Sequence, residues 1–312
     1  MNSNGVNVEH PVGFIRDRNL LEYVWSFPKE VSERISNMGS TGQILDLGSG
    51  ESIAAEQLFH KDLAQLYHTT HDQMVNQGVS MVHPFDPAPV LNKISDKSLN
   101  GRPQVIAVTK EIERKVNTAV YQERLKILSG DFFEDIPDAK LGHPDVILDK
   151  YGVFSYTAKP KQDLDKCLRV LKVGGEINMN LDRMVKDLKV TTEIDPANLM
   201  DKKVVQVLPR NWEAKEIARA TVELPDGRVI DFMDWLKGLK QPGLEVETYA
   251  QKFSYTHLET PPYTASEEKI IGVRIRKTAD VHFEIPELEL IGPPDTRFNP
   301  PRRHFRQVIR KP

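Results

Sequence analysis

The residues best suited to bind a ligand stand at the end of an apolar run, in the segment QILDLGSGES at positions 43–52. Asp46 lies inside the run, which ends in Gly48-Ser49-Gly50. Glycine allows a positive φ and removes the Cβ atom that would keep a ligand away from the backbone. A helix that begins behind such a turn would offer free N–H groups to a carboxylate or a phosphate. Because many turns use glycine for geometry alone, the meaning of this segment depends on what surrounds it.

Three further apolar runs lead into residues that could face the same ligand. The run at 104–108 is followed by Thr109-Lys110-Glu111, the run at 125–128 by Ser129 and Gly130 and then Asp131-Phe132, and the run at 144–149 ends in Asp149, with Tyr151 two residues later. Ligands of open α/β sheets bind outside the carboxyl ends of parallel strands. We therefore expect these residues to gather at one edge of a sheet.

The order of the apolar patterns predicts an α/β fold. Strands are expected at 43–47, 104–108, 125–128, 144–149 and 176–181, and helices at about 52–66, at 109–124 and around Leu164, Cys167, Leu168 and Leu171, which share one helix face. Segments 243–249 and 270–275 can complete the sheet as an antiparallel pair. The expected architecture is a doubly wound, mostly parallel, seven-stranded sheet with helices on both faces.

The chain divides into three expected parts. Residues 1–41 form an N-terminal helical cap in which Pro28 opens a helix over 29–37. Residues 42–278 form the main domain, with insertions at about 67–103 and 182–228, and the second insertion is interpreted as a lid or substrate subdomain. Residues 279–312 are expected to form a proline-rich, basic C-terminal tail.

Composition narrows the class of protein. The 312 residues are 39% hydrophobic and 28% charged, which favours a folded chain with a sizeable core. A net charge of −3 gives no general attraction to nucleic acid. Cys167 is the single cysteine, so no internal disulfide framework is expected. The sequence opens without a secretory signal and contains no run of about 18 apolar residues, so we expect a cytoplasmic protein that does not span a membrane.

Taken in order, five segments resemble the core motifs of class I S-adenosylmethionine-dependent methyltransferases. They are ILDLGSG at 44–50, QVIAVTKE at 104–111, LSGDFF at 128–133, DVILDKYGVF at 145–154 and LRVLKVGGEI at 168–177. The resemblance implies a Rossmann-like domain that binds S-adenosyl-L-methionine and releases S-adenosyl-L-homocysteine. Three features depart from the family pattern: Ser52 replaces a frequent third glycine, Thr109 replaces the usual ribose-binding acid, and the stretch from 51 to 108 is unusually long.

The resemblance implies a role for each strand end. The amino-acid part of the cofactor would be held by Asp46 and the backbone of Gly48, Ser49 and Gly50. Ribose would be bound by Thr109 or Glu111 next to Lys110, and adenine by Asp131 with Phe132 covering the ring. Asp149 and Tyr151 would lie nearest the methyl group, where a carboxylate could orient the acceptor or take its proton and an aromatic ring could face the sulfonium. Each acid has a structural alternative as a cap or local hydrogen-bond acceptor.

Other functions stay open on the sequence alone. In an NAD(P)-dependent oxidoreductase Lys110 could favour a 2′-phosphate, but Ile53 stands where the dinucleotide fingerprint needs its third glycine. The missing ribose acid also suits a methyltransferase-like cofactor-binding protein without turnover. A nucleic-acid methyltransferase is not favoured, because DKYG at 149–152 lacks the Pro-Pro-aromatic run of enzymes that methylate DNA amino groups. The expected partner is a small-molecule methyl acceptor, and the oligomeric state, a homodimer included, is open.

No metal is expected to bind. His68, His71, His83 and Asp86 have side chains that suit a divalent ion. However, His-x-x-His in a proline-rich loop is not a specific signature, and exposed or substrate-facing histidines are the alternative.

Overall fold

The computed structural model describes residues 23, 26–50, 52–58, 101–109, 116, 118–121, 123–129, 133–150, 152–157, 159–180, 188–195, 198–209, 221–224, 226–257, 264–286 and 289–291. In that part of the chain, no helix is both long enough and apolar enough to cross a bilayer.

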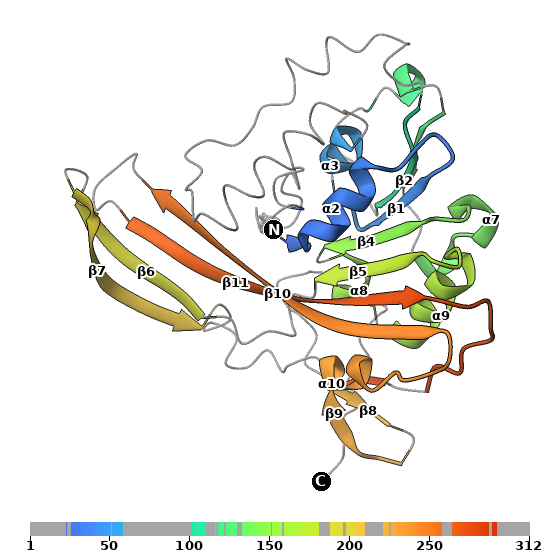
Figure 1. The fold of residues 1–312 in the computed structure, drawn as a ribbon. Coiled ribbons are helices and arrows are strands. Elements are labelled where there is room, and N and C mark those ends of the chain that lie inside the picture. The colour runs from blue at the N-terminus through green and yellow to red at the C-terminus, as the bar shows by residue number, and fades with distance from the viewer. Residues whose placement is uncertain are drawn as a thin grey trace, which may run out of the picture.

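Five parallel strands form the centre of the main sheet (Figure 1). They are β1 (Gln43–Leu47), β2 (Gln104–Thr109), β3 (Leu125–Ser129), β4 (Val146–Lys150) and β5 (Glu176–Asn180), in the spatial order β3-β2-β1-β4-β5. The chain runs outward from β1 to β3 and then returns to β4 on the other side of β1. A switch point therefore lies between β1 and β4, which is where open α/β sheets bind ligands. All five strands were predicted from the sequence.

Two long antiparallel strands continue the sheet beyond β5. Strand β11 (Thr264–Lys277) pairs with β5 through residues 272–276, and β10 (Leu244–His257) pairs with β11 along its whole length. These strands supply the antiparallel pair predicted at 243–249 and 270–275, so the seven-stranded, mostly parallel sheet is confirmed. Both strands are much longer than the sequence pattern indicated.

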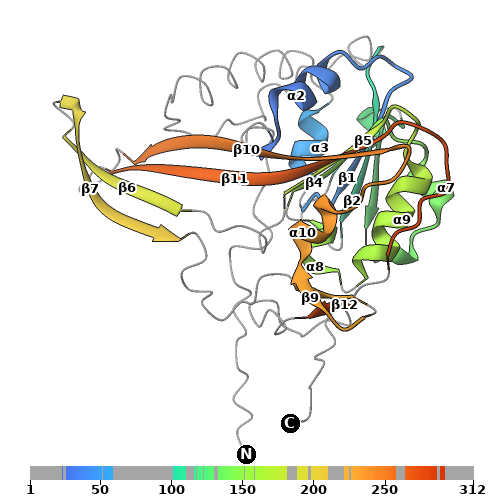
Figure 2. The same cartoon turned by 60° about the horizontal axis from the view of Figure 1, so that its bottom comes forward.

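The extra length of β10 and β11 forms part of an arm that leaves the central domain, as both Figure 1 and Figure 2 show. The far end of β11 pairs with β6 (Leu188–Asp195), which pairs in turn with β7 (Asn198–Pro209). The predicted insertion at 182–228 thus contributes strands β6 and β7 to the same sheet, which has nine described strands. Its last part, β8 (Thr221–Glu223), joins β9 (Val229–Asp231) and β12 (Glu289–Ile291) in a small separate sheet.

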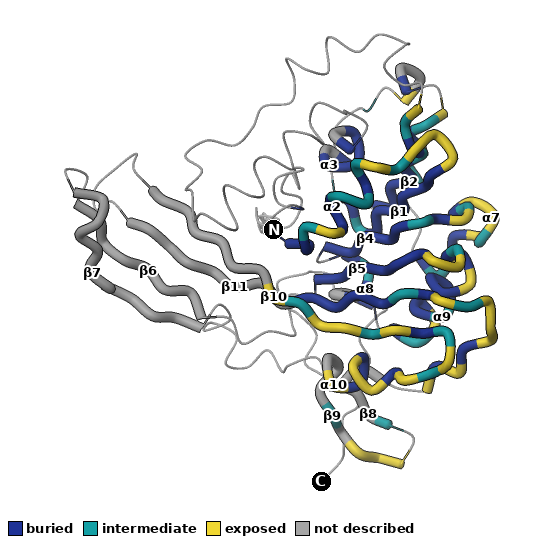
Figure 3. The backbone as a smooth tube through the Cα atoms, in the orientation of Figure 1, coloured by how far each residue is buried: buried dark blue, intermediate teal, exposed yellow. Residues whose placement is uncertain are grey.

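Helices cover the central sheet on both faces, as predicted. On one face, here called the α2 face, α2 (Lys29–Ser36) and α3 (Ile53–Gln57) pack on side chains such as Ile44, Val105 and Leu148. The opposite face, here called the α9 face, is covered by α7 (Asp138–Leu141), α8 (Val153–Tyr156), α9 (Pro160–Val170) and α10 (Phe232–Lys237). Neighbouring strand residues point to opposite faces, so β1 and β4 are buried on both sides (Figure 3).

Several predicted boundaries need adjustment. Pro28 is the N-cap of α2 rather than a residue of its first turn. Where a helix was expected to reach Arg124, the described residues form a 3₁₀ helix, η2 (Thr118–Tyr121), and Glu123 adopts a φ of 64° that ends it. The described part of the expected tail is packed on the domain, since Phe283 and Ile285 are buried in the α9-face core and β12 pairs with β8.

Candidate functional site

The turn after β1 lies against the turn after β4. Gly48 has a φ of 68°, and a Cβ atom there would collide with the Gly152 backbone. A Cβ atom on Gly152 would in turn collide with the Leu47 carbonyl and the Asp149 carboxylate. Glycine at these two positions therefore brings the ends of β1 and β4 into backbone contact. The turns after β1 and β4 therefore touch at the switch point of the sheet.

Gly50 has a different environment from Gly48. Its φ is 59°, and among the described residues no heavy atom lies within 4 Å of the position that a Cβ atom would take. With respect to the described residues, a side chain there would meet no neighbouring atom. Among the described residues, none fills the space next to the Gly50 backbone, and the binding role predicted for this turn stays a prediction.

The end of β2 is tied to the same turn. The Thr109 hydroxyl donates a hydrogen bond to the Gly50 carbonyl at 2.8 Å, and the Ser49 N–H donates to the Val108 carbonyl at 3.0 Å. The ends of β1, β2 and β4 thus meet at one edge. The Ser52 residue that precedes α3 has a φ of 63° and no side-chain capping bond, and its Oγ lies 3.0 Å from the Ser49 Oγ.

Asp46 faces the α2 side of the sheet and is fully buried. Its Oδ1 accepts a hydrogen bond of 2.6 Å from the Tyr23 hydroxyl. The ammonium of Lys150, at the end of β4, lies 5.9 Å from the centroid of the Tyr23 ring. Tyr23 and Lys150 were not predicted as site residues. The only sequence signal was the mixture of apolar and aromatic residues around 19–27.

Asp149 faces the opposite side of the sheet. It follows Leu148, whose side chain packs on the α2 face, so strand alternation sends Asp149 to the α9 face. Its Oδ2 accepts a hydrogen bond of 2.9 Å from the Phe154 N–H in the first turn of α8. The structure thus gives Asp149 a capping contact, the structural alternative considered for it. Asp46 and Asp149 lie near the same edge but on different faces.

Several predicted site residues lie outside the described part of the chain. They are Lys110, Glu111, Asp131, Phe132 and Tyr151, together with the histidines at 68, 71 and 83. Their proposed roles remain predictions from the sequence.

A buried lysine holds the turn that follows positions 131–132. Lys166 on α9 donates hydrogen bonds to the carbonyls of Phe133 at 2.6 Å, Glu134 at 3.1 Å and Ile136. These carbonyls belong to η3 (Phe133–Asp135) and the residue after it. Burial lowers the pKa of the Lys166 ammonium. The lysine was not predicted, because only the tertiary packing of α9 on η3 reveals it.

Two further titratable groups on α9 face the core. Loss of solvent raises the pKa of Asp163 from 3.8 to about 7, although the nearby Thr157 hydroxyl opposes the shift. Neither carboxylate oxygen of Asp163 makes a hydrogen bond of normal geometry in the described structure. Burial also raises the pKa of the Cys167 thiol well above its usual range. The thiol therefore stays protonated and is a poor nucleophile.

No family model matches the sequence, and no curated protein is significantly similar to it. Several solved structures can be superposed on this chain with low TM-scores. The precorrin-6y C5,15-methyltransferase from Geobacter metallireducens has a TM-score of 0.38 at 11% identity, over 80% of this chain and 87% of the other. A putative sarcosine dimethylglycine methyltransferase from Galdieria sulphuraria has a TM-score of 0.37 at 11% identity, over 83% of this chain and 85% of the other. A putative hemolysin from Streptococcus thermophilus has a TM-score of 0.37 at 10% identity, over 86% of this chain and 71% of the other.

The sheet itself is Rossmann-like. It combines a β3-β2-β1-β4-β5 parallel core with the antiparallel strands β11 and β10. The described residues of the first four segments singled out in the sequence lie on β1 to β4 and next to their carboxyl ends, and the fifth segment runs from the end of α9 into β5.

Proposed function

We propose that this protein is a methyltransferase that uses S-adenosyl-L-methionine and acts on a small-molecule acceptor. The observation that carries the proposal is the Gly48–Gly50 turn at the β1/β4 switch point, where no atom of the described residues fills the space next to Gly50. The motif order supports it. The cytoplasmic location expected from the sequence belongs to the same proposal.

The described residues fit the cofactor at the turn. Gly50 would let the amino-acid part approach the backbone, as the missing Cβ contact indicates. The hydroxyl hydrogen of Thr109 is directed at the Gly50 carbonyl, so a ribose hydroxyl would have to donate to the Thr109 oxygen. Asp46 and Tyr23 would form one wall, joined by their hydrogen bond. When bound, the cofactor supplies a methyl group that is already activated by its sulfonium.

The protein's own task would be alignment of the acceptor and exclusion of water. The capping contact with Phe154 makes Asp149 a support for the β4 turn, and this contact competes with a role as general base. We propose that Tyr151 would lie near the methyl group, as the motif resemblance implies. The reaction needs no strong base if the acceptor atom is already nucleophilic.

A dinucleotide-dependent oxidoreductase is the second candidate. Its doubly wound sheet has the parallel order 3-2-1-4-5-6. Here the strand that follows β5 in the sheet is β11, which runs antiparallel to it. Together with Ile53 in place of the third glycine, this reversal favours the methyltransferase.

Calorimetric titration of the full chain with S-adenosyl-L-homocysteine, NADH and NADPH tests the proposal. We expect S-adenosyl-L-homocysteine to bind and both dinucleotides to fail. Gly50→Ala should weaken the binding about tenfold or more, because its methyl group would enter the space used by the ligand.

Gly174→Ala is the matched control for this variant. Gly174 also has a positive φ, 79°, and no described atom within 4 Å of a Cβ position, but it lies in the turn before β5, at the opposite end of the sheet. The Gly174→Ala variant should bind S-adenosyl-L-homocysteine with the affinity of the wild type. Binding of NADPH without S-adenosyl-L-homocysteine would overturn the proposal.

A further inference from the structure

The end of β5 carries a buried amide with one unused atom. Asn180 is fully buried, and its Nδ2 donates to the Ser26 carbonyl at 2.9 Å and to the Tyr249 hydroxyl at 3.2 Å. A backbone carbonyl can only accept, so the atom facing Ser26 must be the amide nitrogen. The Oδ1 atom is then fixed, and it has no hydrogen-bond partner in the described part of the chain. Leaving such an atom buried and unsatisfied is unfavourable.

A buried lysine lies on the strand next to this amide. Lys150 is the register partner of Asn180 on the neighbouring strand, and it is 4% exposed. Register partners in adjacent strands point to the same face, and both side chains contact groups on the α2 face: Lys150 lies over the Tyr23 ring and Asn180 binds Ser26. The two residues therefore lie next to each other on neighbouring strands and on the same face, at the carboxyl end of the sheet.

Tyr249 reaches this place from two strands away. Tyr249 on β10 is opposite Gly272 on β11, and Gly272 is opposite Asn180 on β5. A Cβ atom on Gly272 would collide with the Tyr249 ring. Because position 272 is glycine, the ring can cross β11 and bring its hydroxyl to Asn180. The amide is thus held by groups from β10 and from the segment before α2.

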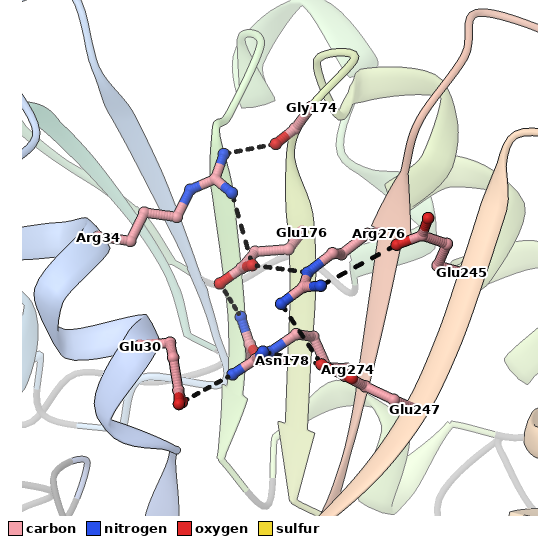
Figure 4. Close-up of polar contacts among 9 residues, drawn as sticks. All are labelled: Glu30, Arg34, Gly174, Glu176, Asn178, Glu245, Glu247, Arg274 and Arg276. Atoms are coloured by element: carbon pink, nitrogen blue, oxygen red, sulfur yellow. Dashed lines mark hydrogen bonds and ion pairs between the residues drawn. The ribbon is translucent and has the colours of Figure 1, made fainter.

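Asn178 shows what a fully satisfied amide looks like on the same strand and face. Its Nδ2 donates to Glu176 at 3.0 Å, and its Oδ1 accepts from Arg274 at 3.3 Å. Both contacts belong to an ion-pair network that joins α2 to β5, β11 and β10 (Figure 4). Asn178 therefore has a complete structural role, whereas the Oδ1 of Asn180 has none within the described chain.

We propose that Asn180 and Lys150 bind a small ligand that carries a hydrogen-bond donor next to a carboxylate, that is, an α-hydroxy or α-amino carboxylate. The Oδ1 of Asn180 requires an N–H or O–H donor, and the Lys150 ammonium attracts an anionic oxygen. The strands are about 4.8 Å apart, so the two ligand groups must be close neighbours. That this ligand is the methyl acceptor rests on the proposed function; the binding site itself does not.

Titration of the full chain with glycolate and with glycine tests the site, with acetate as the probe that lacks a donor. We expect glycolate or glycine to bind at least about tenfold more tightly than acetate, because only they can satisfy the Asn180 Oδ1. Asn180→Ala and Lys150→Met should each weaken that binding about tenfold or more. Asn178→Ala should leave it within about twofold.

Three results would overturn the site: no binding of either probe, equal binding of acetate, or unchanged binding in both Asn180→Ala and Lys150→Met. If Asn180→Ala fails to fold, Lys150→Met decides alone. A parallel titration with S-adenosyl-L-homocysteine separates the two proposals. Probe binding without cofactor binding keeps this site and rejects the methyltransferase, and cofactor binding without probe binding does the reverse.

Discussion

The buried carboxyl group of Asp163 should make the stability of the protein depend on pH. Its pKa is raised from 3.8 to about 7, chiefly because burial removes solvent from the charged form. The folded chain therefore keeps a proton that the unfolded chain releases between about pH 4 and about pH 7. Stability contributed by this group is present at low pH, falls as the pH rises through that window, and is level above it.

The size of the effect follows from the pKa shift. One pKa unit corresponds to about 1.4 kcal/mol, so the ionised form of Asp163 costs at most about 4 kcal/mol at pH values above 7. Between about pH 5.5 and about pH 8, the free energy of unfolding falls only until the pH reaches the pKa of about 7, that is, over roughly one and a half pH units. The total fall is about 2 kcal/mol. Asp163→Asn keeps the shape of the side chain and removes the ionisation.

Urea unfolding at about pH 5.5 and about pH 8 measures this difference. The free energy of unfolding of Asp163→Asn relative to wild type should rise by about 2 kcal/mol between the two pH values. Asp165→Asn is the control: Asp165 lies on the same helix, partly exposed and paired with Lys161 at 2.8 Å. Its effect should stay within about 0.5 kcal/mol at both pH values. An equal effect of Asp163→Asn at both would refute the reasoning.

Three further variants test other parts of the structure. Lys166→Met should lower the free energy of unfolding by about 2–4 kcal/mol, because three carbonyls around η3 lose their buried donor; a loss below about 1 kcal/mol in urea unfolding would contradict this role. Gly272→Ala should change the near-ultraviolet circular dichroism by displacing the Tyr249 ring, and an unchanged spectrum would show that the ring does not depend on glycine. Arg274→Met should cost about 1–2 kcal/mol in thermal unfolding, mostly through the unpaired Asn178, since Glu247 is half exposed and its charge is screened.

The parts of the fold that depend on local sequence were predicted well. The strand at 43–47 and its glycine turn are recognisable because an apolar run and two glycines are adjacent in the chain. The helix carrying Leu164 and Leu168 is recognisable from its apolar spacing. The order of these elements was enough to predict a parallel sheet.

The candidate site was predicted only in part, because several of its contacts join distant segments. Tyr23 reaches Asp46 from a segment whose sequence shows no more than aromatic content. The separation of Asp46 and Asp149 onto two faces depends on strand register, which the residue types alone do not specify. Asn180 is the last residue of β5, the final strand of the parallel core. Its proposed binding role could not be predicted, because its contacts with Ser26 and Tyr249 exist only in the folded chain.

The length of strands β10 and β11 also escaped prediction. Apolar periodicity marks only their central-domain halves, where Val273 and Ile275 are buried. The outer halves are polar in sequence and gain their strand conformation from pairing with each other and with β6.

The uninterrupted pairing of β10 with β11 makes this ribbon intolerant of single-residue insertions and deletions. Fourteen successive pairs run from Leu244–Lys277 to His257–Thr264 without a bulge. Removing one residue near Gly272 would shift the strand register by one residue. Every β11 side chain on one side of the deletion would then point to the opposite face, so the faces of the arm would be exchanged relative to those of the domain. Variation in chain length among natural sequences of this type should therefore collect in the connection at 258–263 and be absent from the ribbon.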